Sequence, residues 1–240
     1  MHRLTSHARG RRPGFTLVEL LIAVTLTGLV TVGIVTFLRQ SLMVYYSVRA
    51  EHSINRDIRA ITGRFASDAV TANYFCLYPS FSTRTAVASG VVVDGSLVDG
   101  QVGDFLVLVY VDPAQASTGT SMITKLVGYY REVTDSTLNN GPVRRFEIPL
   151  STPVDAKSTP MFEVLNTYVT GGISSYPAIS QLAQGLATNT ATQTVVTPPL
   201  FYNLLNRSVM ISAQISASLT EKGVSAQTGN TYNFTISPRG

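Results

Sequence analysis

Residues 15–38 read FTLVELLIAVTLTGLVTVGIVTFL, a stretch with no Lys, Arg, Asp or Pro and with one ionisable side chain, Glu19. A helix of that length rises roughly 36 Å at 1.5 Å per residue, whereas the hydrocarbon core of a bilayer is about 30 Å thick. The stretch therefore predicts a helix that spans a membrane.

A basic leader precedes this stretch, and only Arg39 follows it closely. By the positive-inside rule the N-terminus stays in the cytoplasm and everything after residue 40 is exported. A conventional cleaved secretory signal is the alternative. Its apolar core is about 7 to 15 residues long and ends at a small-x-small cleavage site, and neither feature is present here. The basic residues of the leader are Arg3, Arg9, Arg11 and Arg12.

Composition excludes several classes of function. The 240 residues are 45% hydrophobic and 13% charged, with a formal net charge of +4. Because four of the 18 basic side chains lie in the leader, the rest of the chain is neutral, and we expect no nucleic-acid partner. The single cysteine, Cys76, excludes an intrachain disulfide, and His52 is the one histidine outside the leader. We therefore expect no catalytic residues and no cofactor.

Glu19 is unusual for its position. A carboxylate in a membrane helix costs roughly 2 to 3 kcal/mol and normally has a partner, and we expect none from within the helix itself. One interpretation places Glu19 close enough to the cytoplasmic interface to stay hydrated. The other requires a cation at the same depth, which a new α-amino group at Phe15 would provide.

Residues 11–23, RRPGFTLVELLIA, closely resemble the class III signal of type IV pilins and type II secretion pseudopilins. The resemblance implies that a prepilin peptidase cuts between Gly14 and Phe15 and methylates the new Phe15 amine, while the apolar helix stays on the mature protein. It implies that Glu19 forms an assembly salt bridge with the Phe15 amine of a neighbouring subunit. The partners implied are prepilin peptidase, other pilin or pseudopilin subunits, an inner-membrane assembly platform and the lipid bilayer.

Beyond Leu38 the pattern becomes amphipathic without any breaker, over residues 39–75. Apolar side chains recur at spacings of four, three and four residues, which is the period of one helix face. We predict one continuous helix from about 15 to 72, whose second half packs on a sheet of its own subunit. A membrane anchor followed by a separate helix is the alternative, but the caps and turns that would separate them are missing. The residues expected to pack on the sheet are Ile54, Ile58, Ile61 and Phe65.

Residues 76–240 have the composition of strands and turns and predict an antiparallel sheet domain. Residues 105–111, FLVLVYV, are apolar on both faces, so we expect a central strand that the long helix covers on one side. Residues 223–230 are expected to close a hairpin, and the polar segment near 171–199 to form a surface insertion. Further strands are expected at 91–93, 122–133, 143–150, 208–219 and 232–236.

Four aspartates between residues 94 and 112 form the one carboxylate cluster whose spacing suggests a cation. They do not fit the D-x-D-x-D-G loop of calcium sites, and aspartates beside glycines at strand ends are ordinary turn formers, so we expect no metal. They are Asp94, Asp99, Asp104 and Asp112. Cys76 is expected to be a small apolar filler at the end of the helix, with an intermolecular disulfide as the alternative.

Later segments are similar to W-type minor pilins and J-type minor pseudopilins: residues 64–72, 103–110, 129–131 and 237–239. The resulting hypothesis is an α+β, pilin-like, non-enzymatic minor pilin or pseudopilin that primes or caps a filament. It would be a single-pass protein of the bacterial inner membrane, with its sheet domain in the periplasm or at the cell exterior. The alternatives are an adhesin or ligand-binding protein that uses the 171–199 insertion, and a membrane-anchored enzyme. The sequence leaves a type IV pilus and a type II secretion pseudopilus equally open.

Overall fold

The computed structural model describes residues 14–112, 121–133, 141–185, 199–221 and 224–238, with the backbone alone described at 180–185, 213–221 and 224–232. The chain divides into two units, Met1–Tyr45 and Tyr46–Gly240. Helix α1 (Leu17–Thr71) crosses from the first unit into the second, and antiparallel strands follow it. The fold is therefore the α+β architecture expected from the sequence.

Helix α1 runs without a break for 55 residues, which confirms one continuous helix and rules out an anchor joined to a separate helix. No proline interrupts residues 15–78. Within the apolar half, threonine hydroxyls donate to carbonyls one turn back, so their polarity is satisfied inside the helix. These bonds of 2.7–2.9 Å are made by Thr25, Thr27, Thr31 and Thr36. Among the described residues, α1 is the one helix whose length and composition suit a membrane span.

The main sheet of the second unit has nine strands, counted over the described residues, in the order β1-β5-β6-β7-β8-β10-β9-β4, with β11 paired to β10. Every neighbouring pair is antiparallel. The bounds are β1 (Tyr74–Tyr78), β4 (Val102–Gly103), β5 (Phe105–Val111), β6 (Met122–Arg131), β7 (Gly141–Asp155), β8 (Ala178–Gly185), β9 (Phe201–Leu204), β10 (Ser208–Glu221) and β11 (Val224–Ile236).

The two ends of this sheet order approach each other. The Leu97 amide donates to the Leu77 carbonyl at 2.7 Å, and the Asp104 amide donates to the Pro79 carbonyl at 3.0 Å. A methyl group on Gly103 would lie 2.2 Å from the Tyr78 carbonyl oxygen, so glycine is required where β4 meets β1. The sheet is therefore strongly curled, and its concave side receives a helix.

Strand β5 lies at the centre of two apolar clusters. On one face the second half of α1 packs against the sheet; on the other, the short helix α3 (Met161–Tyr168) and the chain around Phe81 cover it. Leu106 and Leu108 belong to the first cluster, whereas Phe105, Val107 and Val109 belong to the second. The predicted central strand is confirmed, and its second cover, α3, was not foreseen.

Two segments differ from expectation. Residues 178–185, inside the expected polar insertion at 171–199, form strand β8 between β7 and β10; residues 186–198 lie outside the described part of the chain. The expected loop at 223–230 belongs almost entirely to β11, which pairs with β10 from Glu221↔Val224 onward. Backbone groups make the ladder, so Thr, Gln and Asn residues do not prevent a strand where a neighbour supplies the hydrogen bonds.

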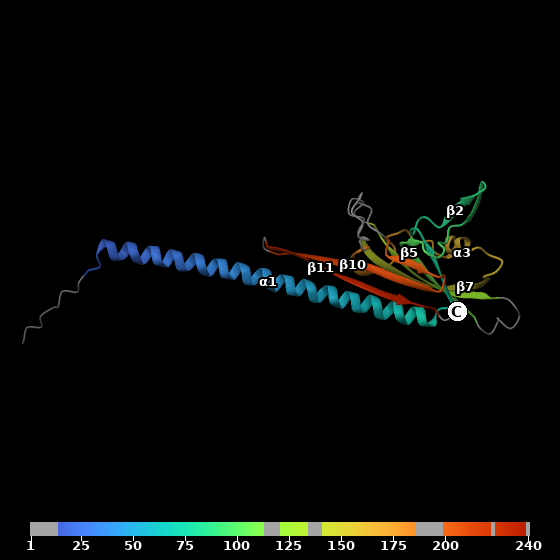
Figure 1. The fold of residues 1–240 in the computed structure, drawn as a ribbon, viewed down its shortest axis with the longest axis horizontal. Helices are drawn as coiled ribbons and strands as arrows, with labels where there is room; N and C mark the ends of the chain where they lie inside the picture. The colour runs from blue at the N-terminus through green and yellow to red at the C-terminus, as the bar shows by residue number, and fades with distance from the viewer. Residues whose placement is uncertain (1–13, 113–120, 134–140, 186–198, 222–223, 239–240) are drawn as a thin grey trace, which may run out of the picture. The chain divides into compact units, whose positions relative to one another are not determined.

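A separate hairpin stands apart from the main sheet and contains β2 (Thr85–Ala88) and β3 (Val91–Asp94). Its turn places Ser89 at φ 52° and Gly90 at φ 80°, the left-handed pair that tight hairpins require. Figure 1 shows this hairpin as an arm that projects from the second unit. Strand β3 contains the short apolar run expected at 91–93.

Candidate processing and assembly site

The peptide bond between Gly14 and Phe15 lies just before the first turn of α1. Neither residue is helical, and the Phe15 side chain is 86% exposed. A methyl group added to Gly14 would meet no atom within 4 Å. A protease can therefore reach this bond without unfolding the helix. The leader arginines and Pro13 lie outside the described residues.

Glu19 is hydrogen-bonded at the start of its own helix by Thr16, a residue that the sequence analysis did not consider. Thr16 precedes the first helical residue, and its amide and hydroxyl donate to Glu19 Oε2 at 2.9 and 3.0 Å. In return the Glu19 amide donates to the Thr16 hydroxyl at 3.3 Å. This reciprocal pattern is a capping box, and such caps are worth about 0.5–2 kcal/mol. The T-x-x-E spacing before an apolar run was a readable signal for it.

The capping box leaves part of the Glu19 carboxylate available. Both bonds from Thr16 end on Oε2, and Glu19 is exposed, so Oε1 is left for a second contact. Thr16 is neutral, and its bonds therefore do not cancel the charge of the carboxylate. Glu19 can still accept a cation from another chain while its own helix start stays capped.

The first unit presents an uncovered apolar surface. Every residue from Gly14 to Tyr45 is exposed. An apolar area of this size on an isolated helix requires lipid or other apolar helices around it. The helix is thus consistent with a membrane-anchored protein of the pilin type.

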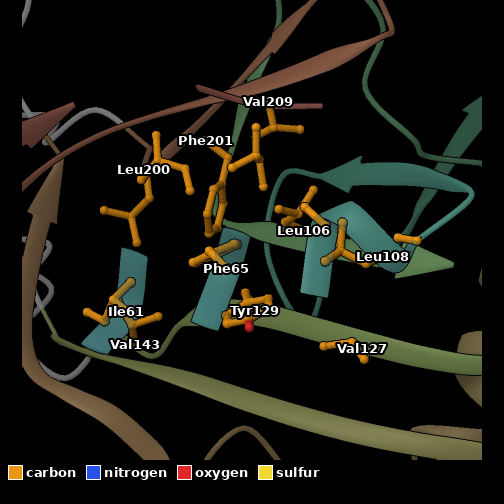
Figure 2. Packing of buried hydrophobic residues seen from close by; sticks show 14 of the residues in the cluster. Ile61, Phe65, Leu106, Leu108, Val127, Tyr129, Val143, Leu200, Phe201 and Val209 are labelled. Carbon is orange, nitrogen blue, oxygen red and sulfur yellow. The ribbon is translucent and has the colours of Figure 1, made fainter. Parts of the chain in front are cut away.

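The residues expected to pack on the sheet are placed in the second unit. Ile54, Ile61 and Phe65 are buried, and Ile58 is partly buried against the same cluster. Figure 2 shows Phe65 between Tyr129 of β6 and Phe201 of β9. The ring centroids of Phe65 and Tyr129 are 3.7 Å apart, and those of Phe65 and Phe201 are 5.8 Å apart.

Polar contacts around Asp68 reinforce this packing. Arg145 Nε of β7 donates to Asp68 Oδ2 at 2.9 Å, the Tyr129 hydroxyl donates to the same oxygen, and the Tyr110 hydroxyl donates to the Asp68 carbonyl at 2.7 Å. Burial, together with the hydrogen bond to Asp68, raises the pKa of Tyr129. Sequence reasoning missed this network because its members lie on α1, β5, β6 and β7.

The four aspartates between residues 94 and 112 lie at separate places in the fold. Asp94 accepts from the Ser96 amide at 2.9 Å and the Phe162 amide at 3.3 Å, and Asp99 accepts from the Leu205 amide at 2.5 Å. Asp104 pairs with Arg131, and Asp112 follows β5. Within the described ranges no group of three or more His, Cys, Asp or Glu residues converges in a way that suits a metal.

Cys76 lies in β1 and not at the end of α1, which stops at Thr71. It is half-buried against the cluster on the α3 side of the sheet, and burial raises the pKa of its thiol to about 12. His52 is exposed on α1. In the part of the chain that the structure describes, neither residue has a hydrogen bond or ion pair that would make it a nucleophile or a base.

Residues 9–35 match the family model described as the prokaryotic N-terminal methylation motif, which covers 27 of the 240 residues. This match supports the class of type IV pilins and pseudopilins, to which the long helix and antiparallel sheet also conform. The match implies processing and assembly with other pilin-type subunits. Comparison with curated proteins and with solved structures returned no match.

Proposed function

We propose that this protein is a non-enzymatic structural subunit, a minor pilin or pseudopilin that primes or caps a filament. The observation that carries the proposal is the methylation motif at the start of a long helix whose first unit is uncovered and apolar. The second half of the same helix is bound to the sheet of its own subunit. Such a chain has one end for assembly and one end for display.

Cleavage after Gly14 would place a new cation at Phe15, next to the capping box. An amine at a helix N-terminus lies at the positive end of the helix dipole, so its own helix does not stabilise it. The remaining Oε1 of a neighbour's Glu19 offers the missing negative charge. The pair would therefore form between subunits, as helices come together in the membrane at matching depth.

The same proposal assigns topology and partners. The leader would stay in the cytoplasm beside prepilin peptidase, and the sheet unit would lie in the periplasm or, after assembly, at the cell exterior. When the apolar helix leaves the bilayer, other pilin or pseudopilin subunits would cover it. Likeness to W-type and J-type subunits supports a minor role at the tip of the filament.

Processing is tested by coexpression with an active prepilin peptidase. Intact-mass measurement should show loss of residues 1–14 and gain of one methyl group. The Gly14→Val variant should stay uncut, because a branched side chain would obstruct the approach of the scissile backbone. A leader that persists on the unsubstituted chain would count against the whole proposal.

Assembly is tested separately with Glu19→Val, followed by crosslinking to partner pilins in membranes without detergent. Leader cleavage should persist and insertion should become easier, since a charge has left the membrane segment, but crosslinking should fall. Thr16→Ser is the matched control, because it keeps the hydroxyl of the capping box and leaves Glu19 in place. Undiminished crosslinking of the Val variant would favour a hydrated Glu19 with no assembly role.

A further inference from the structure

A pocket of about 410 Å³ opens beside the base of the β2–β3 hairpin. It lies between the chain before β2, the last turns of α3 and the segment at Gly172 and Ile173. Arg84 is the one charged side chain in its lining. The other lining residues are Phe81, Ser82, Thr85, Asn166, Gly172 and Ile173.

Arg84 is 9% exposed and has no ion pair with any described carboxylate. Its Nε donates to the Phe81 carbonyl at 2.7 Å. Its Nη1 donates to the Leu165 carbonyl and to Asn166 Oδ1, both at 3.3 Å. All three acceptors are neutral, so the positive charge has been taken largely out of water without a counter-charge.

The second terminal nitrogen of Arg84 is not used. Nη2 makes no hydrogen bond to a described residue. It is not fully buried either, because among the described residues the fully buried side-chain nitrogen and oxygen atoms without a partner both belong to Arg131. Since Arg84 lines the pocket, Nη2 is the atom left to donate to a ligand there. The guanidinium carbon lies 4.6 Å from the Phe81 ring centre and 5.6 Å from that of Phe105, so the two rings hold the plane of the group in place.

We propose that this pocket binds a carboxylate ligand, with Arg84 as the residue that recognises its charge. A carboxylate carries a single negative charge and so matches the single guanidinium in this lining. Ser82 and Thr85 offer hydroxyl donors at the rim, and Phe81 and Ile173 offer apolar contact to the carbon next to the carboxylate. Burial without a carboxylate lowers the pKa of Arg84, and a bound anion would reverse that effect.

The carboxylate has two possible sources, a free small acid or the side chain of an extended segment of another protein. Ser82, Thr85 and Ile173 of the pocket lining are exposed, so either source can reach the pocket. The recognising chemistry is the same in both cases. The experiment therefore compares sodium acetate with N-acetylglutamate amide.

The test uses the full chain in neutral detergent micelles with 15N-labelled arginine, at constant ionic strength. Acetate should shift the Arg84 Nε–Hε resonance, and the shift should reach a plateau as the acetate concentration rises. Acetamide, which has the same shape but no charge, should cause no such shift. N-acetylglutamate amide should bind as well as acetate if a free acid is the natural ligand, and more tightly if a peptide is. Because this comparison uses the unsubstituted chain, it does not depend on how any variant folds.

Variants complete the test. Arg84→Lys keeps the charge but loses the planar group whose Nε and Nη1 are fixed by the Phe81 and Leu165 carbonyls, and should weaken acetate binding about tenfold or more. Arg59→Gln is the matched control, since it removes an exposed charge on α1 that does not line the pocket, and should leave binding unchanged. An equal response to acetamide, tighter binding of inorganic phosphate than of acetate, or full binding by the Arg84→Lys variant would overturn the proposal.

Discussion

The Phe65 ring of α1 stacks on the Tyr129 ring of β6 with 21° between their planes, and the hydroxyl of the same tyrosine donates to Asp68, three residues further along α1. One side chain of the sheet thus makes both the apolar and the polar contact with the helix. Since Phe65 is 1% exposed, the stack lies inside the core of the second unit. The stability of the sheet therefore depends on a helix that also carries the membrane anchor.

Replacing Phe65 with alanine should lower the free energy of unfolding by about 3–5 kcal/mol, the usual cost of deleting a buried aromatic side chain. Urea unfolding of the full chain in detergent, followed by circular dichroism, measures the loss. Phe37→Ala is the control, because Phe37 is 67% exposed in the apolar unit and its removal should barely move the transition. Equal effects of the two substitutions would mean that Phe65 is not part of the core.

A chain shortened to begin near Gln40 should be soluble and folded, because it loses only apolar, exposed helix. A chain that begins near Cys76 should aggregate or bind a hydrophobic dye, since it exposes the sheet face under Ile54, Ile61 and Phe65. Each of these side chains contributes roughly 1.5–3 kcal/mol when buried, whereas the free energy of unfolding of a whole domain is about 5–15 kcal/mol. Their joint loss is therefore comparable to the stability of the domain. A cooperative thermal transition of the shorter chain at a similar midpoint would show that helix and sheet are independent.

Asp104 and Arg131 form a buried ion pair at 2.5 Å, and the Arg131 side chain is fully buried with Nε and Nη1 unpaired among the described residues. Asp104→Asn should cost about 3–5 kcal/mol, because it leaves a guanidinium in the core without a counter-charge. Asp57→Asn is the comparison, since Asp57 pairs at 3.8 Å with the exposed Arg56, and should cost less than about 1 kcal/mol. Chemical unfolding of both variants measures the difference.

Glu132 should make the folded state less stable as the pH falls. Hydrogen bonds from Ser174 and then Arg144 hold the pKa of Glu132 below its ordinary value of 4.5. Its contribution is therefore present above about pH 4.5 and is lost as the pH falls through the lowered folded pKa. Glu132→Gln should lower the melting temperature at about pH 6. The difference between the melting temperatures at about pH 6 and about pH 3.5 should be smaller in this variant than in the unsubstituted chain. A variant with an unchanged difference would show that Glu132 does not contribute.

Cys76 should resist alkylation in the native protein. Burial raises the pKa of the thiol to about 12, so almost no thiolate exists at neutral pH, and thiolate is the reactive form. Iodoacetamide at about pH 8 should modify Cys76 slowly when the chain is folded and at the rate of an ordinary thiol in denaturant. Mass spectrometry reads the result without ambiguity, because the chain has one cysteine. Fast native modification would favour the intermolecular disulfide instead.

Local periodicity was sufficient for much of the fold. The predominantly apolar stretch at residues 15–38 and the Ile54–Phe65 spacing predict α1, because a long apolar run and a 3.6-residue period are both read along one helix. FLVLVYV predicts a central strand covered by the long helix on one side, because the run is apolar on both faces. The methylation motif at residues 9–35 also needs no tertiary information, since it is a pattern along the sequence.

Tertiary structure decided what depends on distant partners. The buried residues of the short helix α3 are Met161, Val164 and Leu165. They pack on the face of β5 that α1 does not cover, and this contact explains why they are apolar. Polar residues 178–185 become a strand because β7 and β10 supply its hydrogen bonds. Arg84 reaches a carbonyl 81 residues away, and Asp68 reaches an arginine 77 residues away. No pattern along the chain indicates such pairs, because their energies depend on burial and distance, which exist only after the sheet has curled around the helix.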